Sequence, residues 1–504
     1  MNAASLFHAA ERRSPTALAL RWDDGAMSYG ELGDASRRFG SVLATLGVGA
    51  DERVAILLPN HPAFAVALLG TFWHGSAAAV LSPAWRIADA ERAIVNADAR
   101  VLVTTRAVAA TLHACPPTVL VVDAEDDPRS FARECARQPA GLESPPASRA
   151  ATEPATILYS SGTTGDPKGI VLSHGNLVFN AKSKVRYCGM RSDDALALVV
   201  PMSHCFGQNV VLLGALAAGA SVRIYTRFHA NDVHAGIRAG EVTHLYAAPL
   251  VFERLLDAGA PESLRILRVA LSAAAPLPPA LAARWHTATA KPLYQGYGLS
   301  ESSPFATFDD GRERVPGSVG HAIDGVEIRI GEIEGDAWLG EDALGEVAIR
   351  GPNVMTGYWR RPDETARALR GGWLRTGDAG RLSASGALQL VDRLDDAINV
   401  AGFKVYPSDV ERAIASHVDV AEAVAYRVAG ASRGSQVALD VVAVPGATIT
   451  PDDIHALAAT ELARFQRPSF VRIVSAFPRS PSGKVLRRVL TASFHLPPPS
   501  APAG

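Results

Sequence analysis

A loop rich in glycine, hydroxyl residues and one lysine follows a short β-prone run that ends at Tyr159. It reads Ser160-Ser-Gly-Thr-Thr-Gly-Asp-Pro-Lys168-Gly and leads into a helix-like segment. Free backbone N–H groups, hydroxyl donors and one ammonium so close together can hold a polyphosphate. The loop is not a Walker A motif, because Pro167 precedes the lysine and Gly169 follows it in place of serine or threonine. The alternative is a flexible loop without a ligand, so other motifs must decide.

Length and charge limit the functions open to the chain. A chain of 504 residues is too long for one ordinary core, so we expect at least two domains. A hydrophobic content of 48% with 20% charged residues is typical of a globular protein. The net charge of −2 gives no long-range attraction to nucleic acid or to an anionic membrane, and we expect neither as a partner.

The cysteines and the N-terminus favour a soluble, cytoplasmic protein. The four cysteines are scattered and lack the paired spacing of a zinc site, so they are expected to be reduced thiols. The first residues lack a basic region followed by an apolar run, and no uncharged apolar stretch reaches membrane-spanning length. We therefore expect no membrane span.

The elements that must position the loop alternate between helical and strand patterns. Residues 1–150 show this alternation, and it continues to about residue 300, as in doubly wound α/β domains. From 317 to 391 the chain has short β-prone pieces with frequent glycine, which indicates a small antiparallel sheet or barrel, and a compact unit follows residue 395. The predicted strands are 54–58, 101–103, 195–200, 221–225, 244–246, 269–271, 326–330, 345–350, 387–391, 420–428, 437–443 and 470–474, and the predicted helices are 31–46, 62–74, 86–96, 209–218, 408–416 and 454–463.

The predicted fold class is therefore α/β. A large N-terminal domain of doubly wound layered sheets, with a small β-rich subdomain, is followed by a small α+β C-terminal domain.

Five further motifs follow the loop along the chain. They are Pro201-Met-Ser-His204-Cys-Phe206, Tyr294-Gln-Gly-Tyr297-Gly-Leu-Ser300-Glu301, Thr376-Gly-Asp378, Asp392-Arg393-Leu-Asp395 and Pro478-Arg-Ser-Pro-Ser-Gly-Lys484. Together with the loop, and in this order, they resemble the adenylate-forming superfamily of acyl- and aryl-CoA ligases, peptide-synthetase adenylation domains and luciferases. Serine at position 300 replaces the usual threonine of the Tyr-Gly-x-Thr-Glu segment. The resemblance covers nearly the whole chain.

The resemblance implies ATP and Mg²⁺ as reactants of a carboxylate activation. Lys168 and the loop hydroxyls suit the β- and γ-phosphates, and Glu301 would ligate Mg²⁺ through a hard carboxylate oxygen. The alternatives from residue type alone are a turn-capping role for Asp378 and a core position for Tyr297. The implied ATP-binding residues are Ser160, Ser161, Gly162, Thr163, Thr164, Gly165, Lys168, Ala274, Ala275, Gly296, Tyr297, Gly298, Ser300, Asp378 and Arg393.

The C-terminal motifs imply a mobile domain. Lys484 matches the family lysine that bridges the carboxylate and the α-phosphate, although a lysine near a C-terminus is otherwise a solvated charge. With Glu301, Ser300 and Lys168 it forms the implied catalytic set. Asp395 matches the family hinge, which divides the chain into residues 1–394 and a mobile domain of 395–504. The Gly402 backbone is the expected CoA contact.

The acid pocket and the acyl acceptor follow from the resemblance too. Peptide-synthetase domains place an aspartate after Gly207, and this chain has no acidic residue there, so we expect an acid without an α-amino group. His204 would gate or flank the pocket, unless it is a buried hydrogen-bonded histidine. The pocket would suit an aromatic or a short to medium apolar acid. Its implied lining is His204, Phe206, Val210, Tyr246, Gly296, Pro304 and Phe305.

Three functions remain open at this stage. Free CoA is the expected acceptor, because no carrier-protein segment follows Lys484 or precedes Phe7. The enzyme alternative is a stand-alone adenylating enzyme that loads a carrier protein. The third reading is a catalytically silent nucleotide-binding homologue, which would have no need for Lys484. We expect a monomer or a homodimer.

Overall fold

The computed structural model describes residues 1–139, 144–160, 168–309, 311, 317–333, 335–400, 403–429, 435–480 and 483–494. The chain divides into two compact units. The first comprises residues 1–328 and 348–375, and the second comprises 329–347 and 376–504. No helix among the described residues has the length and the apolar character that crossing a membrane requires.

A nine-stranded sheet forms one layer of the first unit. Its strands from β13 to β1 in the order below are parallel, while β14, β15 and β2 pair antiparallel at the two edges. The order is β15 (His321–Ala322), β14 (Thr307–Asp309), β13 (Tyr294–Tyr297), β12 (Val269–Ser272), β11 (His244–Ala247), β9 (Ala195–Leu198), β10 (Ser221–Ile224), β1 (Leu18–Trp22) and β2 (Gly25–Ser28). Parallel strands buried on both faces explain the continuous apolar runs of this region.

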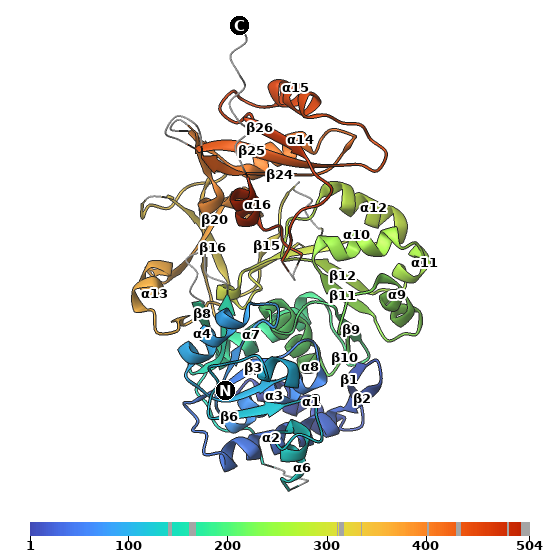
Figure 1. Cartoon of the computed structure of the whole chain (residues 1–504), viewed down its shortest axis with the longest axis vertical. Coiled ribbons are helices and arrows are strands. Elements are labelled where there is room, and N and C mark those ends of the chain that lie inside the picture. Colours follow the sequence, from blue (N-terminus) through green and yellow to red (C-terminus); the bar gives the residue numbers. More distant parts are fainter. Residues whose placement is uncertain are drawn as a thin grey trace. The chain divides into compact units, whose positions relative to one another are not determined.

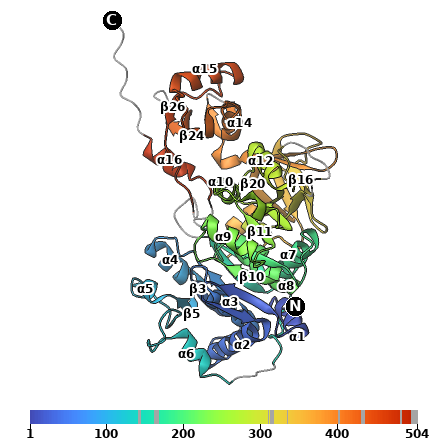
Figure 2. The same cartoon turned by 90° about the vertical axis from the view of Figure 1, so that its right-hand side faces the viewer.

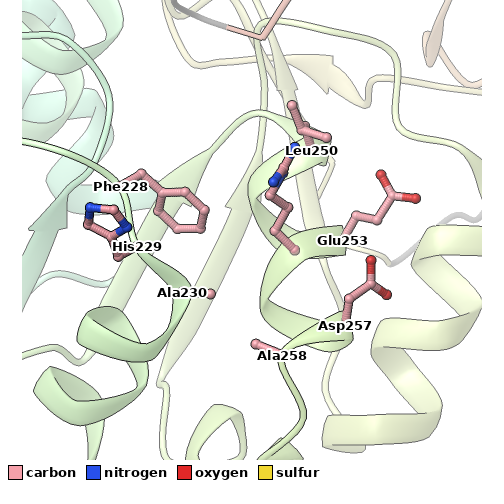
Figure 3. Close-up of a pocket in the computed structure, with 8 residues that line it drawn as sticks. Phe228, His229, Ala230, Leu250, Glu253, Asp257 and Ala258 are labelled. Atoms are coloured by element: carbon pink, nitrogen blue, oxygen red, sulfur yellow. The ribbon is translucent and has the colours of Figure 1, made fainter. Parts of the chain in front are cut away.

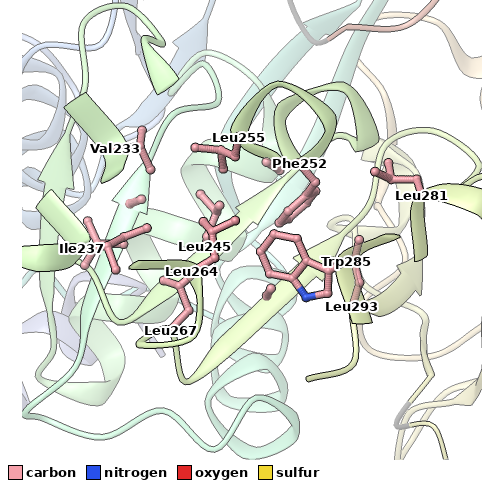
Figure 4. Packing of buried hydrophobic residues seen from close by; sticks show 14 of the residues in the cluster. Val233, Ile237, Leu245, Phe252, Leu255, Leu264, Leu267, Leu281, Trp285 and Leu293 are labelled. Carbon is pink, nitrogen blue, oxygen red and sulfur yellow. The ribbon is translucent and has the colours of Figure 1, made fainter. Parts of the chain in front are cut away.

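Helices cover this sheet beside β11 and β12 (Figure 1). They are α9 (Ala230–Arg238), α10 (Pro249–Asp257), α11 (Pro261–Leu264) and α12 (Pro279–Thr289). Phe252 of α10 meets Trp285 of α12 edge to face, with ring centroids 5.2 Å apart, inside a cluster of buried aliphatic residues (Figure 4). This core fixes the strands whose ends carry several of the predicted site residues.

A seven-stranded sheet forms the other layer of the first unit, with α3 (Pro62–His74) packed against β3 and α2 (Tyr29–Thr45) packed against α3 (Figure 2). Strands β3 to β7 are parallel, and β8 and β18 continue the sheet antiparallel. The order is β18 (Gly357–Tyr358), β8 (Lys168–Ser173), β7 (Pro154–Ser160), β4 (Ala77–Val80), β3 (Arg53–Leu57), β5 (Ala99–Thr104) and β6 (Thr118–Val121). The remaining helices of this unit are α1 (Ala4–Arg13), α4 (Ile87–Ala97), α5 (Arg106–Ala109), α6 (Phe131–Ala136), α7 (His174–Tyr187), η1 (Phe206–Leu212), α8 (Leu213–Ala218), η2 (Ser300–Ser302) and α13 (Pro362–Ala368).

The predicted helix 209–218 is two helices in the structure. The π-helix η1 starts at Phe206 and runs into α8, and α7 packs against both. Ser173 caps α7, since its side chain accepts from the Asn176 N–H while the Asn176 side chain accepts from the Ser173 N–H. The cap fixes where α7 starts after β8.

The second unit contains a three-stranded sheet. A separate five-stranded sheet includes the three strands within which the chain crosses from one unit to the other. The five-stranded sheet has the order β16 (Glu327–Gly331), β17 (Gly345–Arg350), β20 (Trp373–Leu382) and β19 (Leu369–Arg370), with β21 (Leu388–Arg393) on β20. The three-stranded sheet is β24 (Val420–Ala429), β25 (Ser435–Ala443) and β26 (Phe470–Ile473), and the other elements are η3 (Leu394–Asp396), β22 (Ile398–Val400), β23 (Phe403–Val405), α14 (Pro407–Ile414), α15 (Pro451–Glu461) and α16 (Arg487–Ser493). The predicted α/β class is confirmed. The boundary predicted at residue 395 lies within the second unit and stays a prediction.

Candidate active site

The carboxyl ends of three neighbouring parallel strands carry predicted site residues. Ends of parallel strands meet at one edge of a sheet, where open α/β sheets bind ligands. Tyr246 lies on β11, Tyr297 ends β13, and Ala274 follows β12. Ser272 pairs with Gln295, and Ala274 and Tyr297 each lie two residues further along the chain. Ala274 has a φ of 70°, a backbone conformation unusual for alanine.

The segment after β13 turns back sharply onto itself. A Cβ on Gly298 would lie 2.0 Å from the Pro304 carbonyl oxygen, so only glycine fits there. Asn353, which lies about 50 residues further along the chain, holds this segment. Its side-chain Nδ2 donates to the Phe305 carbonyl at 3.0 Å, and its backbone carbonyl accepts from the Ser303 hydroxyl at 2.7 Å. These contacts fix η2, which carries Ser300 and Glu301.

Asn60 holds the loop that carries His204. Its Oδ1 accepts from the Met202 N–H at 2.8 Å, and its Nδ2 donates to the carbonyls of Val200 and Tyr225, both at 3.1 Å. Asn60 follows β3 of the seven-stranded sheet, whereas Val200 and Tyr225 follow β9 and β10 of the nine-stranded sheet. The loop position therefore depends on both sheets.

Lys168 and Glu301 meet the same tyrosine. The Tyr358 hydroxyl donates to Glu301 Oε1 at 3.0 Å, and the Lys168 ammonium lies 5.2 Å from the centroid of the Tyr358 ring. Tyr358 lies on β18, where it pairs with Ile170 of β8, two residues from Lys168. Lys168 also forms an ion pair with Glu364 Oε2 at 2.5 Å, and together with Arg361 it lowers the pKa of Glu364. The structure thus gathers two residues predicted from distant motifs.

The donor set fits Mg²⁺ held jointly with phosphates. Among the described residues no group of three or more His, Cys, Asp or Glu side chains is placed to hold a metal ion. Mg²⁺ in phosphate-transfer sites takes one or two carboxylates and keeps phosphate and water oxygens for its other positions. Glu301 offers such a carboxylate, held in place by Tyr358.

His204, Cys205 and Ser300 are neighbours. The Cys205 sulfur lies 3.1 Å from Ser300 Oγ and 3.7 Å from His204 Nδ1. His204 Nδ1 accepts from the Phe206 N–H at 3.2 Å. The Cys205 sulfur raises the pKa of His204, against the burial that lowers it. The structure therefore brings His204 and Ser300, from two separate motifs, close to the same Cys205 sulfur.

Several residues of the predicted acid-pocket lining lie around Phe305. A Cβ on Gly296 would lie 3.5 Å from the edge of the Phe305 ring, and the Lys184 ammonium lies 3.4 Å from its centroid and 5.8 Å from that of Tyr246. Asn209 Nδ2 donates to the Ser303 carbonyl at 3.3 Å, which ties η1 to the segment of Pro304 and Phe305. Phe206 and Val210, which were also predicted to line the pocket, are buried on η1.

Sequence reasoning missed four residues of this region: Tyr358, Asn60, Asn180 and Lys184. Asn180 and Lys184 are buried on α7, one helical turn apart. Their signal in the sequence was a polar pair at the spacing of i and i+4 on the apolar face of a helix. Tyr358 and Asn60 gave no local signal.

The predicted ribose pair forms in the second unit. Asp378 on β20 and Arg393 on β21 are directly opposite in the antiparallel ladder, and Arg393 Nη1 donates to Asp378 Oδ1 at 2.9 Å. Asp378 is 8% exposed, and its N–H donates to Thr376 Oγ1 at 3.1 Å. The strand pairing, not chance proximity, sets the distance between the two side chains.

Lys484 lies in a loop whose two arms are hydrogen-bonded. The Ser480 N–H donates to the Lys484 carbonyl at 2.8 Å, and the Lys484 N–H donates to Ser480 Oγ at 3.1 Å. Arg479 anchors the loop to Glu422 on β24 through its guanidinium. The Lys484 side chain is exposed and therefore accessible to a ligand.

Several predicted residues lie outside the described part of the chain. They are Ser161, Gly162, Thr163, Thr164 and Gly165 of the phosphate loop and Gly402 at the expected CoA contact. The backbone of Ser160 ends β7, and Asp395 is exposed in η3. Their roles stay predictions.

A pocket of about 500 Å³ lies apart from these motifs (Figure 3). Phe228, His229 and Ala230 form one wall, and Glu253 and Asp257 project from successive turns of α10 on the other. Asp257 already pairs with Arg284 at 2.7 Å. No predicted site residue lines this pocket, so we do not place the acid there.

Comparison with known proteins covers nearly the whole chain. The model of the AMP-binding enzyme family matches residues 6–359, and that of the AMP-binding enzyme C-terminal domain matches 409–484. Feruloyl-CoA synthase of Amycolatopsis sp. is 30% identical over 498 residues, which cover 96% of this chain and 97% of that one. 4-Coumarate-CoA ligase 5 of Oryza sativa subsp. japonica is 30% identical over 500 residues, covering 96% and 93%.

A solved structure agrees with these relatives. ATP-bound MatB from Rhodopseudomonas palustris superposes with a TM-score of 0.90 at 30% identity, covering 98% of this chain and 99% of that one. The resemblance to the adenylate-forming superfamily is thereby confirmed. The chain belongs to the AMP-binding enzyme family.

Proposed function

We propose that the chain is an ATP-dependent carboxylate-CoA ligase that releases AMP and pyrophosphate. The observation that carries this proposal is the contact of Tyr358 with both Lys168 and Glu301. An ammonium that can bind phosphate oxygens and a carboxylate that can bind Mg²⁺ therefore both lie against the Tyr358 side chain. Family membership and the CoA-ligase relatives support the same reaction.

In the first half-reaction a carboxylate oxygen of the acid attacks the α-phosphorus of ATP. The bond from the α-phosphorus to the bridging oxygen breaks, and pyrophosphate leaves with its electrons. Bound Mg²⁺ would supply positive charge for the phosphate oxygens. Lys168 would stabilise the leaving pyrophosphate, the Ser300 hydroxyl would donate to the α-phosphate, and Lys484 would bridge the two reacting groups.

Asp378 and Arg393 would bind the ribose. A carboxylate accepts hydrogen bonds from the two ribose hydroxyls, and a guanidinium donates to their oxygens. The existing ion pair keeps both groups in place before ATP arrives. Such preorganisation lowers the cost of ordering the site.

In the second half-reaction the CoA thiol, as its thiolate, attacks the acyl carbonyl carbon. The carbon–oxygen bond to the adenylate breaks, the thioester forms, and AMP leaves. We propose that residues 395–504 turn about Asp395 between the two steps, because one site must serve two chemistries. The acid is aromatic or short to medium in length, in keeping with the feruloyl and 4-coumarate relatives.

The test is pyrophosphate release with ATP and Mg²⁺ across aryl, short, medium and long-chain acids, each with and without CoA. The expected result is acid-dependent pyrophosphate with equal amounts of AMP and acyl-CoA. Formation of ADP, or no dependence on any acid, would overturn the proposal. Acyl-adenylate without a CoA thioester would instead indicate a carrier protein as the acceptor. Light scattering would show whether the enzyme is a monomer or a homodimer.

A further inference from the structure

Two polar side chains on α7 are buried without protein partners. Lys184 is 1% exposed, and among the described residues it has no ion pair and no hydrogen bond from its side chain. Asn180 is fully buried, and within the described part of the chain neither its Nδ2 nor its Oδ1 has a hydrogen-bond partner. The two residues are four apart on one helix and so share a face.

A further unpaired polar atom occurs on an element that contacts this helix. Gln208 Oε1 is buried without a hydrogen-bond partner among the described residues. Gln208 lies on η1, which packs against α7, and the Tyr246 ring faces the Lys184 ammonium. More than 90% of buried polar groups in proteins are paired, so several orphans in one region indicate a missing ligand.

Lys184 contacts residues that were predicted to line the acid pocket. Its ammonium sits over the face of the Phe305 ring, and Gly296 meets the edge of the same ring. Its stem packs near Gly214, where a Cβ would lie 3.7 Å from Lys184 Cγ. The attraction of aromatic rings offsets only part of the cost of removing an ammonium from water. A buried ammonium is therefore stable only with a hydrogen-bond acceptor or an anion beside it.

We infer that Lys184, with Asn180, binds an oxygen atom at the end of the acid remote from its reacting carboxylate. The acid is then an aromatic or cyclic one with a distal hydroxyl, carbonyl or carboxylate group. This inference rests on the proposed function, and it narrows the range of acids that the enzyme is proposed to activate. Burial lowers the pKa of Lys184 to about 8, so the ammonium form still predominates near neutral pH.

The test compares four acids that differ at one position: 3-phenylpropanoate and its 4-methyl, 4-hydroxy and 4-carboxy derivatives. The 4-methyl acid controls for size. Pyrophosphate release with CoA is measured for wild type, Lys184→Met, Asn180→Leu and the control Lys182→Met, in which an exposed lysine of the same helix is replaced.

Wild type should prefer an oxygenated acid over the 4-methyl acid. A hydrogen bond to a charged group implies that Lys184→Met lowers kcat/KM for the oxygenated acid by about 10- to 100-fold. The 4-methyl acid should be unaffected or improved, and Lys182→Met should match wild type for every acid. Comparison of the 4-hydroxy and 4-carboxy acids identifies whether the oxygen is neutral or anionic.

A preference that is absent, or that survives in Lys184→Met, would overturn the inference and leave the ligase function intact. That result would mean that water alone satisfies Lys184. If no acid releases pyrophosphate, equilibrium dialysis of the four acids with wild type and with Lys184→Met still shows whether Lys184 contributes to binding. Loss of binding of the oxygenated acid in the variant would support the role of Lys184, and equal binding or none would refute it. Asn180→Leu should weaken binding of the same oxygenated acid. The test therefore remains possible if one of the two variants fails to fold.

Discussion

Replacing Lys184 with methionine should stabilise the enzyme at neutral pH. The side chain is buried, and burial lowers its pKa from 10.5 to about 8. Each unit of pKa is worth about 1.4 kcal/mol, so keeping this lysine charged costs the fold about 3 kcal/mol as an upper bound. Methionine has similar length, fills the same space and carries no charge.

The gain depends on pH in a predictable direction. Below pH 8 Lys184 is protonated in both the folded and the unfolded chain, and the full cost is present. Between pH 8 and 10.5 the unfolded chain binds the proton and the folded chain does not, so wild-type stability rises with pH. The advantage of Lys184→Met should therefore be largest at pH 7 and shrink by pH 10.

Urea unfolding followed by tryptophan fluorescence measures this difference. All but Trp338 of the seven tryptophans lie in the unit that contains Lys184. The matched control is Lys182→Met, which should match wild type at each pH. Subtracting wild type from Lys184→Met cancels the titration of Tyr246 and other groups. A variant less stable than wild type at pH 7, or a difference independent of pH, would refute the reasoning.

Three further variants test the proposed roles. Lys484→Ala should abolish adenylation but leave thioester formation from supplied acyl-adenylate largely intact, and adenylation at the wild-type rate would show that the role is misassigned. Asp395→Pro should slow thioester formation more than adenylation in single-turnover assays, whereas equal damage to both steps would count against the hinge. Tyr358→Phe removes the hydrogen bond to Glu301 but keeps the ring beside Lys168, so the KM for ATP with Mg²⁺ should rise about three- to tenfold; an unchanged KM at limiting Mg²⁺ would contradict that role.

Local patterns in the sequence predicted most of the fold. The buried runs before Lys168 and around residues 195–200 are strands, because parallel strands covered on both faces are continuously apolar. The helix predicted at 62–74 has those bounds, since Pro62 begins it and left-handed Gly75 ends it. Strand β20 was not predicted, because its glycines and charged residues break the apolar alternation.

Only those site residues that lie within a recognised motif were predicted from the sequence. Asp378 and Arg393 came from two separate motifs, and only the β20–β21 register shows that they pair. Tyr358 and Asn60 act through partners more than 50 residues away, so no local window contains their signal. Lys184 belongs to no motif, and its spacing of four residues from Asn180 indicates a shared helix face but not that both side chains are buried.

The contacts of Asn60 have a consequence for enzyme engineering. Residues 201–207 look like a module that could be exchanged between relatives to change the acid accepted. Yet Asn60 holds the Met202 N–H and the carbonyls of Val200 and Tyr225, and each group left unpaired by its loss would cost about 1–3 kcal/mol. A grafted loop must therefore be transplanted together with its partner at position 60, more than 140 residues earlier in the chain.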